Sequence, residues 1–203
     1  MNLVALDFST VRRGVCVSAG SGKEAVVTTT DRAAGPLGLI QSALIEAGLQ
    51  LEEIDALAVG LGPGSYTGIR SSIAIAQGFQ LGRIVKLSGI SSADVIAHSA
   101  AIEGEFAVVI DAQRGEFYCA TYRRTNDVVD QTSELRILSP DEIDRLKCPI
   151  IGPEQRGITL FPDPGRLAQM AREQAAFVEG HRLEPIYLRP PEFKKAPPPR
   201  QID

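Results

Sequence analysis

The chain has 203 residues, of which 44% are hydrophobic, 23% charged and 5% aromatic, as in soluble globular proteins with one large domain or two small lobes. This composition excludes collagen-like, disordered and disulfide-rich classes. The 21 Lys and Arg residues face 25 Asp and Glu residues, and the resulting formal charge of -4 excludes a basic field that would itself draw the chain onto nucleic acid.

The first residues indicate a strand and lack the charged start, long apolar core and cleavage site of a secretory signal, so we expect no export. No apolar stretch of the sequence approaches the roughly 20 residues that a membrane-spanning helix needs. The three cysteines lie far apart without a C-x-x-C motif, which suits a reducing compartment. We therefore expect a cytoplasmic protein without membrane association.

The first half of the chain alternates short apolar runs with turns that contain Arg, Gly and Ser. Strands are predicted where apolar and β-branched residues run together, and helices where apolar residues recur every three to four positions. In chain order, the predicted elements are strands at 2–7, 14–19 and 24–30, a helix at 36–48, a strand at 54–60, a helix at 67–82, a strand at 84–87 and a helix at 91–101.

The second half repeats this order of elements. The predicted elements are strands at 105–112, 115–123 and 127–138, a helix to about residue 147, a strand at 149–152 and a helix at 164–179. Ser139, Pro140 and Glu142 form a strong helix start, with a capping residue, proline at the first helical position and a capping-box partner. Gly180 is predicted to end the last helix.

The chain is therefore predicted to contain the order β-β-β-α-β-α twice, with an aspartate, Asp7 or Asp111, ending the first strand of each half. Two such mixed-sheet α/β lobes with a cleft between them resemble the actin-like ATPases and sugar kinases, the ASKHA proteins with ribonuclease H-like lobes. We expect a duplicated actin-like fold with an N-terminal lobe at 1–102, a smaller C-terminal lobe at 103–188 and a Pro-rich basic tail at 189–203.

The aspartates are candidates for a remnant phosphate site. In actin-like ATPases the turn after the first strand wraps phosphate, and Asp7, Ser9 and Thr10 occupy that place here, with Asp111 in the equivalent place of the second half. The alternative is structural: Asp7 ends a strand, and the two hydroxyls cap a turn. Little in the second half resembles an adenosine pocket, so the motif alone does not establish a nucleotide site.

A glycine-rich loop stands between the strand at 54–60 and the following helix. It consists of Gly62, Pro63, Gly64, Ser65, Tyr66, Thr67 and Gly68, with Arg70 just beyond it. Exposed N–H groups at a helix start attract anions, but the spacing matches neither common nucleotide-binding pattern, and no lysine follows. The alternative is a structural turn whose glycines permit close backbone packing.

The predicted helix at 67–82 has no charged side chain between residues 71 and 82, and the helix at 36–48 carries only Glu46. Helices so poor in charge are expected to be covered on most sides, and small residues let a neighbouring backbone approach. We therefore predict an interface with a partner or a second copy. The candidate interface residues are Leu39, Ile40, Leu44, Ser71, Ala74, Ile75 and Gly78. The alternative is that these residues belong to the chain's own core.

Several segments together resemble the bacterial TsaB (YeaZ) family over nearly the whole chain. They are DFST at 7–10, AVGLGPGSYTGIR at 58–70, LSGISS at 87–92, DAQRGEFY at 111–118 and PIYLR at 185–189. The GPGSYTGIR element is the most specific of them. The resemblance implies an actin-like protein that supports, without catalysing, the formation of N6-threonylcarbamoyladenosine beside the anticodon of tRNAs that read A-starting codons.

The resemblance also implies partners. These would be the catalytic paralogue TsaD and the ATPase TsaE, with tRNA contacted indirectly through the complex and a homodimer formed by the chain alone. No cofactor is expected in the chain by itself, and ATP or ADP within the complex stays open.

No metal site is predicted. The metal motif of TsaD, aligned from Gly89, places its two ligand positions on Ser92 and Ile96, and isoleucine supplies no donor atom. His98 and His181 are interpreted as ordinary helix or surface residues. The alternative to a non-catalytic scaffold is a stand-alone actin-like ATPase or small phosphotransferase that uses Asp7.

Overall fold

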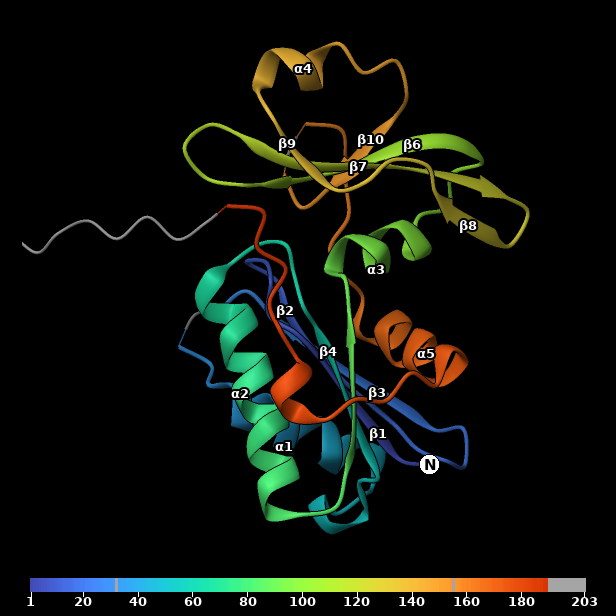
Figure 1. Cartoon of the computed structure of the whole chain (residues 1–203). Coiled ribbons are helices and arrows are strands. Elements are labelled where there is room, and N and C mark those ends of the chain that lie inside the picture. The colour runs from blue at the N-terminus through green and yellow to red at the C-terminus, as the bar shows by residue number, and fades with distance from the viewer. Residues whose placement is uncertain (32, 155, 190–203) are drawn as a thin grey trace, which may run out of the picture.

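The computed structural model describes residues 1–31, 33–154 and 156–189, so all but the first residue of the predicted tail at 189–203 lies outside the described residues. Figure 1 shows two β-sheets, one above the other, with a helix between them. The lower sheet comes from the first half of the chain and carries helices on both faces, and the upper sheet comes from the second half.

The first sheet has the strand order β3-β2-β1-β4-β5. Its strands are β1 (Leu3–Asp7), β2 (Arg13–Ser18), β3 (Glu24–Thr29), β4 (Ala56–Gly60) and β5 (Lys86–Ile90). β1 pairs antiparallel with β2 and parallel with β4. Every residue of β1 and β4 is buried, as expected of central strands covered on both faces. β5 begins two residues later than predicted, and Ile84 before it is fully exposed.

The second sheet repeats this topology in the order β11-β10-β6-β7-β8. Its strands are β6 (Gly104–Asp111), β7 (Phe117–Thr125), β8 (Val128–Gln131), β9 (Arg136–Leu138), β10 (Ile150–Gly152) and β11 (Ile158–Thr159). β6 is again antiparallel to the next strand and parallel to β10, so the predicted duplication of mixed sheets is confirmed. The single strand expected at 127–138 is two strands, and the short, exposed β11 was not predicted.

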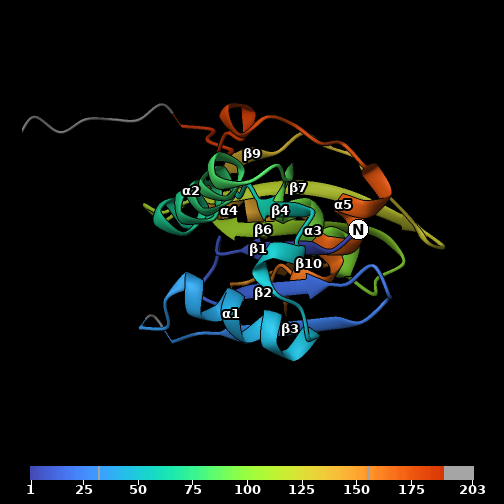
Figure 2. The ribbon, with the colours of Figure 1, turned by 90° about the horizontal axis from the view of Figure 1, so that it is seen from below.

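The helices cover the sheets in layers. They are α1 (Pro36–Ala47), α2 (Tyr66–Gly82), α3 (Ser92–Ser99), α4 (Pro140–Asp144) and α5 (Pro164–Gln174), with short 3-10 turns η1 (Leu51–Glu53) and η2 (Gly180–Arg182). α1 and α2 share a core with one face of the first sheet, and α5 packs on the opposite face. Figure 2 shows α2 and α5 on opposite sides of that sheet.

α3 lies between the two sheets and joins their cores. Val95 packs with the first sheet, whereas Ile96 and Ala97 pack with Phe106 and Tyr122 of the second. Five of its eight residues are buried, so this short helix has a covered side toward each lobe. α4 covers the outer face of the second sheet through Ile143.

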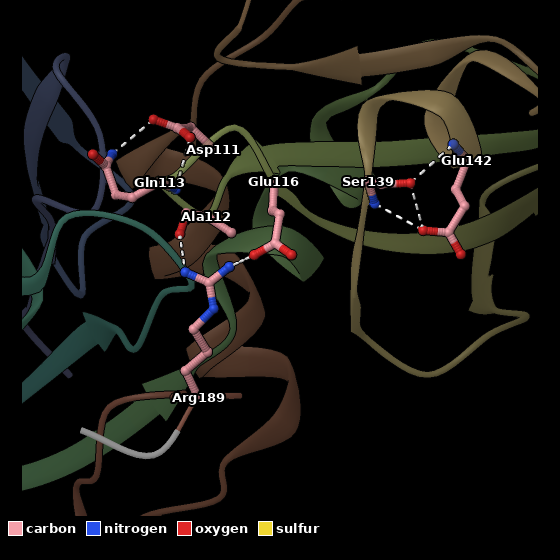
Figure 3. Close-up of polar contacts among 7 residues, drawn as sticks. All are labelled: Asp111, Ala112, Gln113, Glu116, Ser139, Glu142 and Arg189. Carbon is pink, nitrogen blue, oxygen red and sulfur yellow. Dashed lines mark hydrogen bonds and ion pairs between the residues drawn. The ribbon is translucent and has the colours of Figure 1, made fainter. Parts of the chain in front are cut away.

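α4 begins at the predicted capping box. The Ser139 N–H donates to Glu142 Oε2 at 2.8 Å, and the Glu142 N–H donates back to Ser139 Oγ at 3.4 Å (Figure 3). These reciprocal bonds satisfy two N–H groups that a helix start leaves open. The bonds that the Ser139 N–H and hydroxyl donate to the Glu142 carboxylate lower the pKa of that carboxyl.

α5 differs from the prediction in its end and adds a contact that the sequence did not indicate. It ends at Gln174, and the C-cap Ala175 adopts a left-handed conformation with φ 47°, so the predicted end at Gly180 is wrong. Its buried Leu167 and Met170 pack against Leu3 of the first sheet. The division at residues 102 and 103 stays a prediction, but the C-terminal part of the chain returns to the first sheet.

Two glycines of α2 have opposite surroundings. A Cβ atom on Gly68 would overlap the carbonyl oxygen of Phe8, whereas a Cβ on Gly78 would meet no atom within 4 Å. We expect Gly68→Ala to lower the free energy of unfolding by about 1–3 kcal/mol through overpacking. Gly78→Ala is expected to raise it by about 0.5–1 kcal/mol, because alanine loses less backbone entropy.

Urea unfolding followed by circular dichroism measures both values. Equal effects of the two substitutions would contradict this packing of α2 on the Asp7 turn.

Candidate functional site

The Asp7 carboxylate lies inside the protein at the end of β1. Asp7 is only 1% exposed. Oδ1 accepts the Ser9 N–H at 2.8 Å and the Ser9 hydroxyl at 2.6 Å, and Oδ2 accepts the Ser92 hydroxyl at 2.7 Å. Burial raises the pKa of Asp7, although the bonds from Ser9 and Ser92 act in the opposite direction. Both oxygens are thus used within the protein.

Ser92 extends this network to the glycine-rich loop. Its Oγ accepts the Gly62 N–H at 3.1 Å, and its own N–H donates to the Gly62 carbonyl at 2.7 Å. A Cβ on Gly60 would overlap the Asp7 carboxylate, so the end of β4 also touches this group. Asp7 therefore ties the ends of β1 and β4 to the loop and to the start of α3.

The other residues of the expected phosphate site lie apart from Asp7. Thr10 is exposed enough to line a surface pocket, and its hydroxyl donates to the Arg12 carbonyl at 2.9 Å. Asp111 lies in the second lobe and accepts the backbone N–H and side-chain amide of Gln113 (Figure 3). Asp111 lines a pocket between the lobes that Asp7 does not line. The pocket that Asp111 lines is thus separate from the buried Asp7 carboxylate.

The glycine-rich loop packs closely on the turn that follows Asp7. The Ser65 N–H donates to the Ser9 carbonyl at 2.6 Å, and Ser65 Oγ accepts the Gly68 N–H as the N-cap of α2. Gly64 has φ 144°, and a Cβ there would overlap the Ser9 carbonyl oxygen. Pro63 follows a cis peptide bond. These contacts fit the structural interpretation of the loop.

A pocket of about 600 Å³ lies where three distant segments meet between the lobes. Its lining residues are Gly64, Ser65, Tyr66, Thr67, Arg70, Asp111, Ala112, Gln113, Arg114, Tyr118, Tyr187 and Arg189. The three segments are those of GPGSYTGIR, DAQRGEFY and PIYLR. Tyr118, Tyr187 and Arg189 were not predicted as site residues. The sequence signal for these residues was that they belong to the motifs DAQRGEFY and PIYLR. Because these motifs lie far apart in the sequence, the sequence did not indicate that they meet at one pocket.

Aromatic and cationic side chains dominate this inter-lobe pocket. The rings of Tyr66 and Tyr187 stack with centroids 5.5 Å apart. The Arg70 guanidinium lies 5.1 Å from the Tyr66 ring centroid and donates to the Tyr66 hydroxyl at 2.8 Å. Arg189 donates to the Ala112 carbonyl at 3.2 Å and pairs with Glu116 (Figure 3). The C-terminal segment is thereby tied to both lobes.

Residues 1–31, 33–154 and 156–189 contain no group of three His, Cys, Asp or Glu side chains that could hold a metal ion. His98 Nδ1 lies 2.9 Å from the Asp94 carbonyl, and His181 lies in η2.

Within the same described ranges, no helix is long and apolar enough to cross a membrane.

The candidate interface residues divide between core and surface. Leu39, Ile40 and Leu44 are 7%, 2% and 6% exposed, so these side chains pack inward on the first sheet. Ala74 and Gly78 of α2 are exposed, and Ser71 and Ile75 are half-buried.

The apolar side chains that α1 presents to solvent are instead Leu37 and Ile45, at 66% and 71% exposure. A groove of about 660 Å³ runs beside them to Phe79 of α2, with Ile40 and Leu44 also lining it. α1 therefore adds different side chains to the surface than the sequence predicted.

The raised pKa of Asp7 gives a testable pH dependence. A carboxyl group with a raised pKa binds its proton more tightly in the folded chain, so its contribution to stability is full below the unfolded-state pKa and falls as pH rises through the folded-state pKa. Asp7→Asn removes this titration. We expect the free energy of unfolding of the unsubstituted chain, minus that of the variant, to fall as pH rises and then level off.

Denaturant unfolding of both proteins across acid and neutral pH measures this difference. Asp7→Ala, which removes the acceptors of Ser9 and Ser92, is expected to be the less stable variant at every pH. A difference that rises with pH would contradict the burial of the carboxylate.

Comparison with known proteins identifies relatives in sequence. A family model described as "TsaD: tRNA N6-adenosine threonylcarbamoyltransferase" matches residues 36–179. The "tRNA threonylcarbamoyladenosine biosynthesis protein TsaB" of Escherichia coli (strain K12) is 36% identical over 110 residues, which are 53% of this chain and 48% of that protein. The protein of the same name from Buchnera aphidicola is 32% identical over 96 residues, 46% of each chain. The matches span about half the length of these curated relatives.

A solved structure extends the likeness over the whole fold. "YeaZ from Pseudomonas aeruginosa" superposes with a TM-score of 0.79 and 26% identity, covering 92% of this chain and 99% of that chain. Together with the two mixed sheets, this likeness confirms the expected duplicated actin-like α/β fold. Because the family model, the TsaB relatives and the YeaZ structure agree, the chain belongs to the TsaB (YeaZ) members of the TsaD family.

Proposed function

We propose that the chain is a non-catalytic component of the machinery that forms N6-threonylcarbamoyladenosine in tRNA. In this role it binds a TsaD-type catalytic protein and helps to position a TsaE-type ATPase, and it forms a homodimer when alone. Its E. coli relative is named as a biosynthesis protein of this nucleoside. The observation that carries the proposal is the apolar face that α1 and α2 leave uncovered.

This face has the composition of a helix-packing surface. Leu37 and Ile45 of α1 and Leu81 of α2 are 66%, 71% and 91% exposed. Ala74 and Gly78 let a neighbouring helix approach the backbone of α2, since a Cβ at Gly78 would meet no atom within 4 Å. Exposed apolar patches of this kind mark interaction sites in soluble proteins. Two such faces together would make a four-helix contact.

The state of Asp7 supports a role without catalysis. A carboxylate that holds a metal ion or the waters of a metal ion needs lone pairs facing solvent, whereas Asp7 is 1% exposed and both of its oxygens accept hydrogen bonds inside the protein. The stand-alone ATPase or phosphotransferase that uses Asp7 has no comparable observation in its favour. ATP or ADP belongs, in this proposal, to the assembled complex rather than to this chain alone.

The cellular setting follows from the same proposal. Cys16, Cys119 and Cys148 are free thiols, which suits the reducing cytoplasm where tRNA is modified. With a formal charge of -4, the chain is expected to reach tRNA mainly through its partners.

A charge on the uncovered face tests the interface. We expect Ala74→Glu and Ile75→Glu each to weaken self-association by about tenfold or more, because the contact would bury an unpaired carboxylate. Analytical ultracentrifugation measures the association, and circular dichroism checks that the monomer stays folded. Val128→Glu is the matched control, since Val128 is a 59% exposed apolar residue on β8, in the other lobe. Dimers that persist in both α2 variants would refute the interface.

The partner is tested by mixing the purified chain with a TsaD-type protein from the same organism. Size-exclusion chromatography with light scattering is expected to show a mixed species that Ala74→Glu abolishes and Val128→Glu preserves. Failure of the unsubstituted chain to form any mixed species would contradict the proposed function.

A further inference from the structure

Two pockets share lining residues of the glycine-rich loop, and together they are called the trough below. The inter-lobe pocket of about 600 Å³ shares Ser65 and Thr67 with a neighbouring pocket of about 430 Å³, which reaches Thr10 and Arg13 on the first lobe. The trough therefore extends from the turn after β1, across the start of α2, to the turn after β6.

The charge of this trough opposes that of the whole chain. Among the described residues that line it, Arg13, Arg70, Arg114 and Arg189 are cationic and Asp111 carries the carboxylate. The chain as a whole has a formal charge of -4. Arginines gathered on a mildly acidic protein make a local positive field, and such a field attracts a polyanion.

Two of these arginines contact neutral groups. Arg70 donates to the Tyr66 hydroxyl and lies over the Tyr66 ring, and Arg13 donates to the Asp31 backbone carbonyl. Their positive charge is thus not cancelled by these contacts. Arg189 is different, because it pairs with Glu116 and serves to fix the C-terminal segment. Arg13 and Arg70 are the residues best placed to meet phosphate.

The trough also offers aromatic surface. Tyr66 and Tyr187 form a stacked pair, yet they are 59% and 42% exposed. Tyr118 lines the same pocket. Exposed tyrosines beside arginines are the combination with which proteins bind single-stranded nucleic acid, because bases stack on the rings while arginines meet the backbone.

We propose that this trough binds a short single-stranded segment of RNA, with a base stacked on the Tyr66–Tyr187 pair and phosphates held by Arg70 and Arg13. The inference rests on the proposed function and deepens it, since it gives the chain a direct contact with RNA. An acidic peptide would meet the arginines but leave the tyrosine pair without a stacking partner. A single mononucleotide would occupy one pocket and leave the other arginine unused.

The test uses the full chain and a fluorescein-labelled heptaribonucleotide without secondary structure. Fluorescence anisotropy at low salt is expected to show saturable binding that weakens as salt rises. Arg70→Ala and Tyr187→Ala should each weaken it by about tenfold, within the range known for stacking and phosphate contacts. Arg123→Ala is the matched control, because Arg123 is an exposed arginine on β7 outside the lining residues.

One variant is expected to act in the opposite direction. Asp111→Asn removes the carboxylate from the trough, so RNA should bind about two- to threefold more tightly. The amide oxygen still accepts the Gln113 backbone N–H, although the bond from the Gln113 side-chain amide is lost. A substitution that merely disturbed the fold would weaken binding instead. Thermal melts followed by circular dichroism identify any variant that has lost its fold.

The proposal is overturned if the heptaribonucleotide does not bind, if Arg70→Ala and Arg123→Ala behave alike, or if ATP or AMP displaces the RNA at equal molar concentration. Displacement by mononucleotide would make the ligand a single nucleotide. Because the chain alone is used, loss of RNA binding with an intact TsaD-type complex removes this inference and keeps the proposed function. If RNA binds but no mixed complex forms, the RNA site stands and the proposed function is contradicted.

Discussion

The buried carboxylate of Asp7 is the interaction on which the arrangement of this protein depends. Its two oxygens accept bonds from Ser9 and Ser92, and Ser92 in turn binds Gly62 in both directions. One carboxylate thus fixes the end of β1, the loop before α2 and the first turn of α3. Burying it is costly, and each hydrogen bond offsets part of that cost. The turn after β1, predicted from the sequence as a remnant phosphate site, joins these three segments through Asp7.

That joint sets the positions of both functional surfaces. By holding the glycine-rich loop against the Asp7 turn, it orients α2, whose outer side forms the uncovered apolar face. The same loop places Tyr66 where the C-terminal segment can bring Tyr187 onto it. The proposed partner face therefore lies on the side of α2, and the proposed RNA trough lies at the N-terminal end of the same helix. The two surfaces meet at Ser71, which is a candidate interface residue and also lines the trough.

Much of this fold could be predicted from local signals, and the errors have physical reasons. Gly48 and the Ser139 capping box mark helix ends with side chains or backbone freedom that few other residues supply. Ala175 ends α5 in a left-handed conformation that alanine rarely adopts, so the residue type did not indicate this end. α1 is apolar on two sides, so periodicity does not reveal that Leu39 faces the core. The inter-lobe pocket depends on contacts between distant segments, which no local pattern encodes.

The return of α5 to the first sheet has a consequence for how the chain folds during synthesis. Leu3 belongs to the first strand made, but Leu167 and Met170, which cover it, are made near the end. The face of the first sheet that α5 covers therefore stays partly exposed to solvent until the second lobe has been translated. Contacts of such long sequence separation slow folding and leave intermediates prone to aggregate. The two halves of this duplicated chain therefore complete their folding together, after α5 has been synthesised.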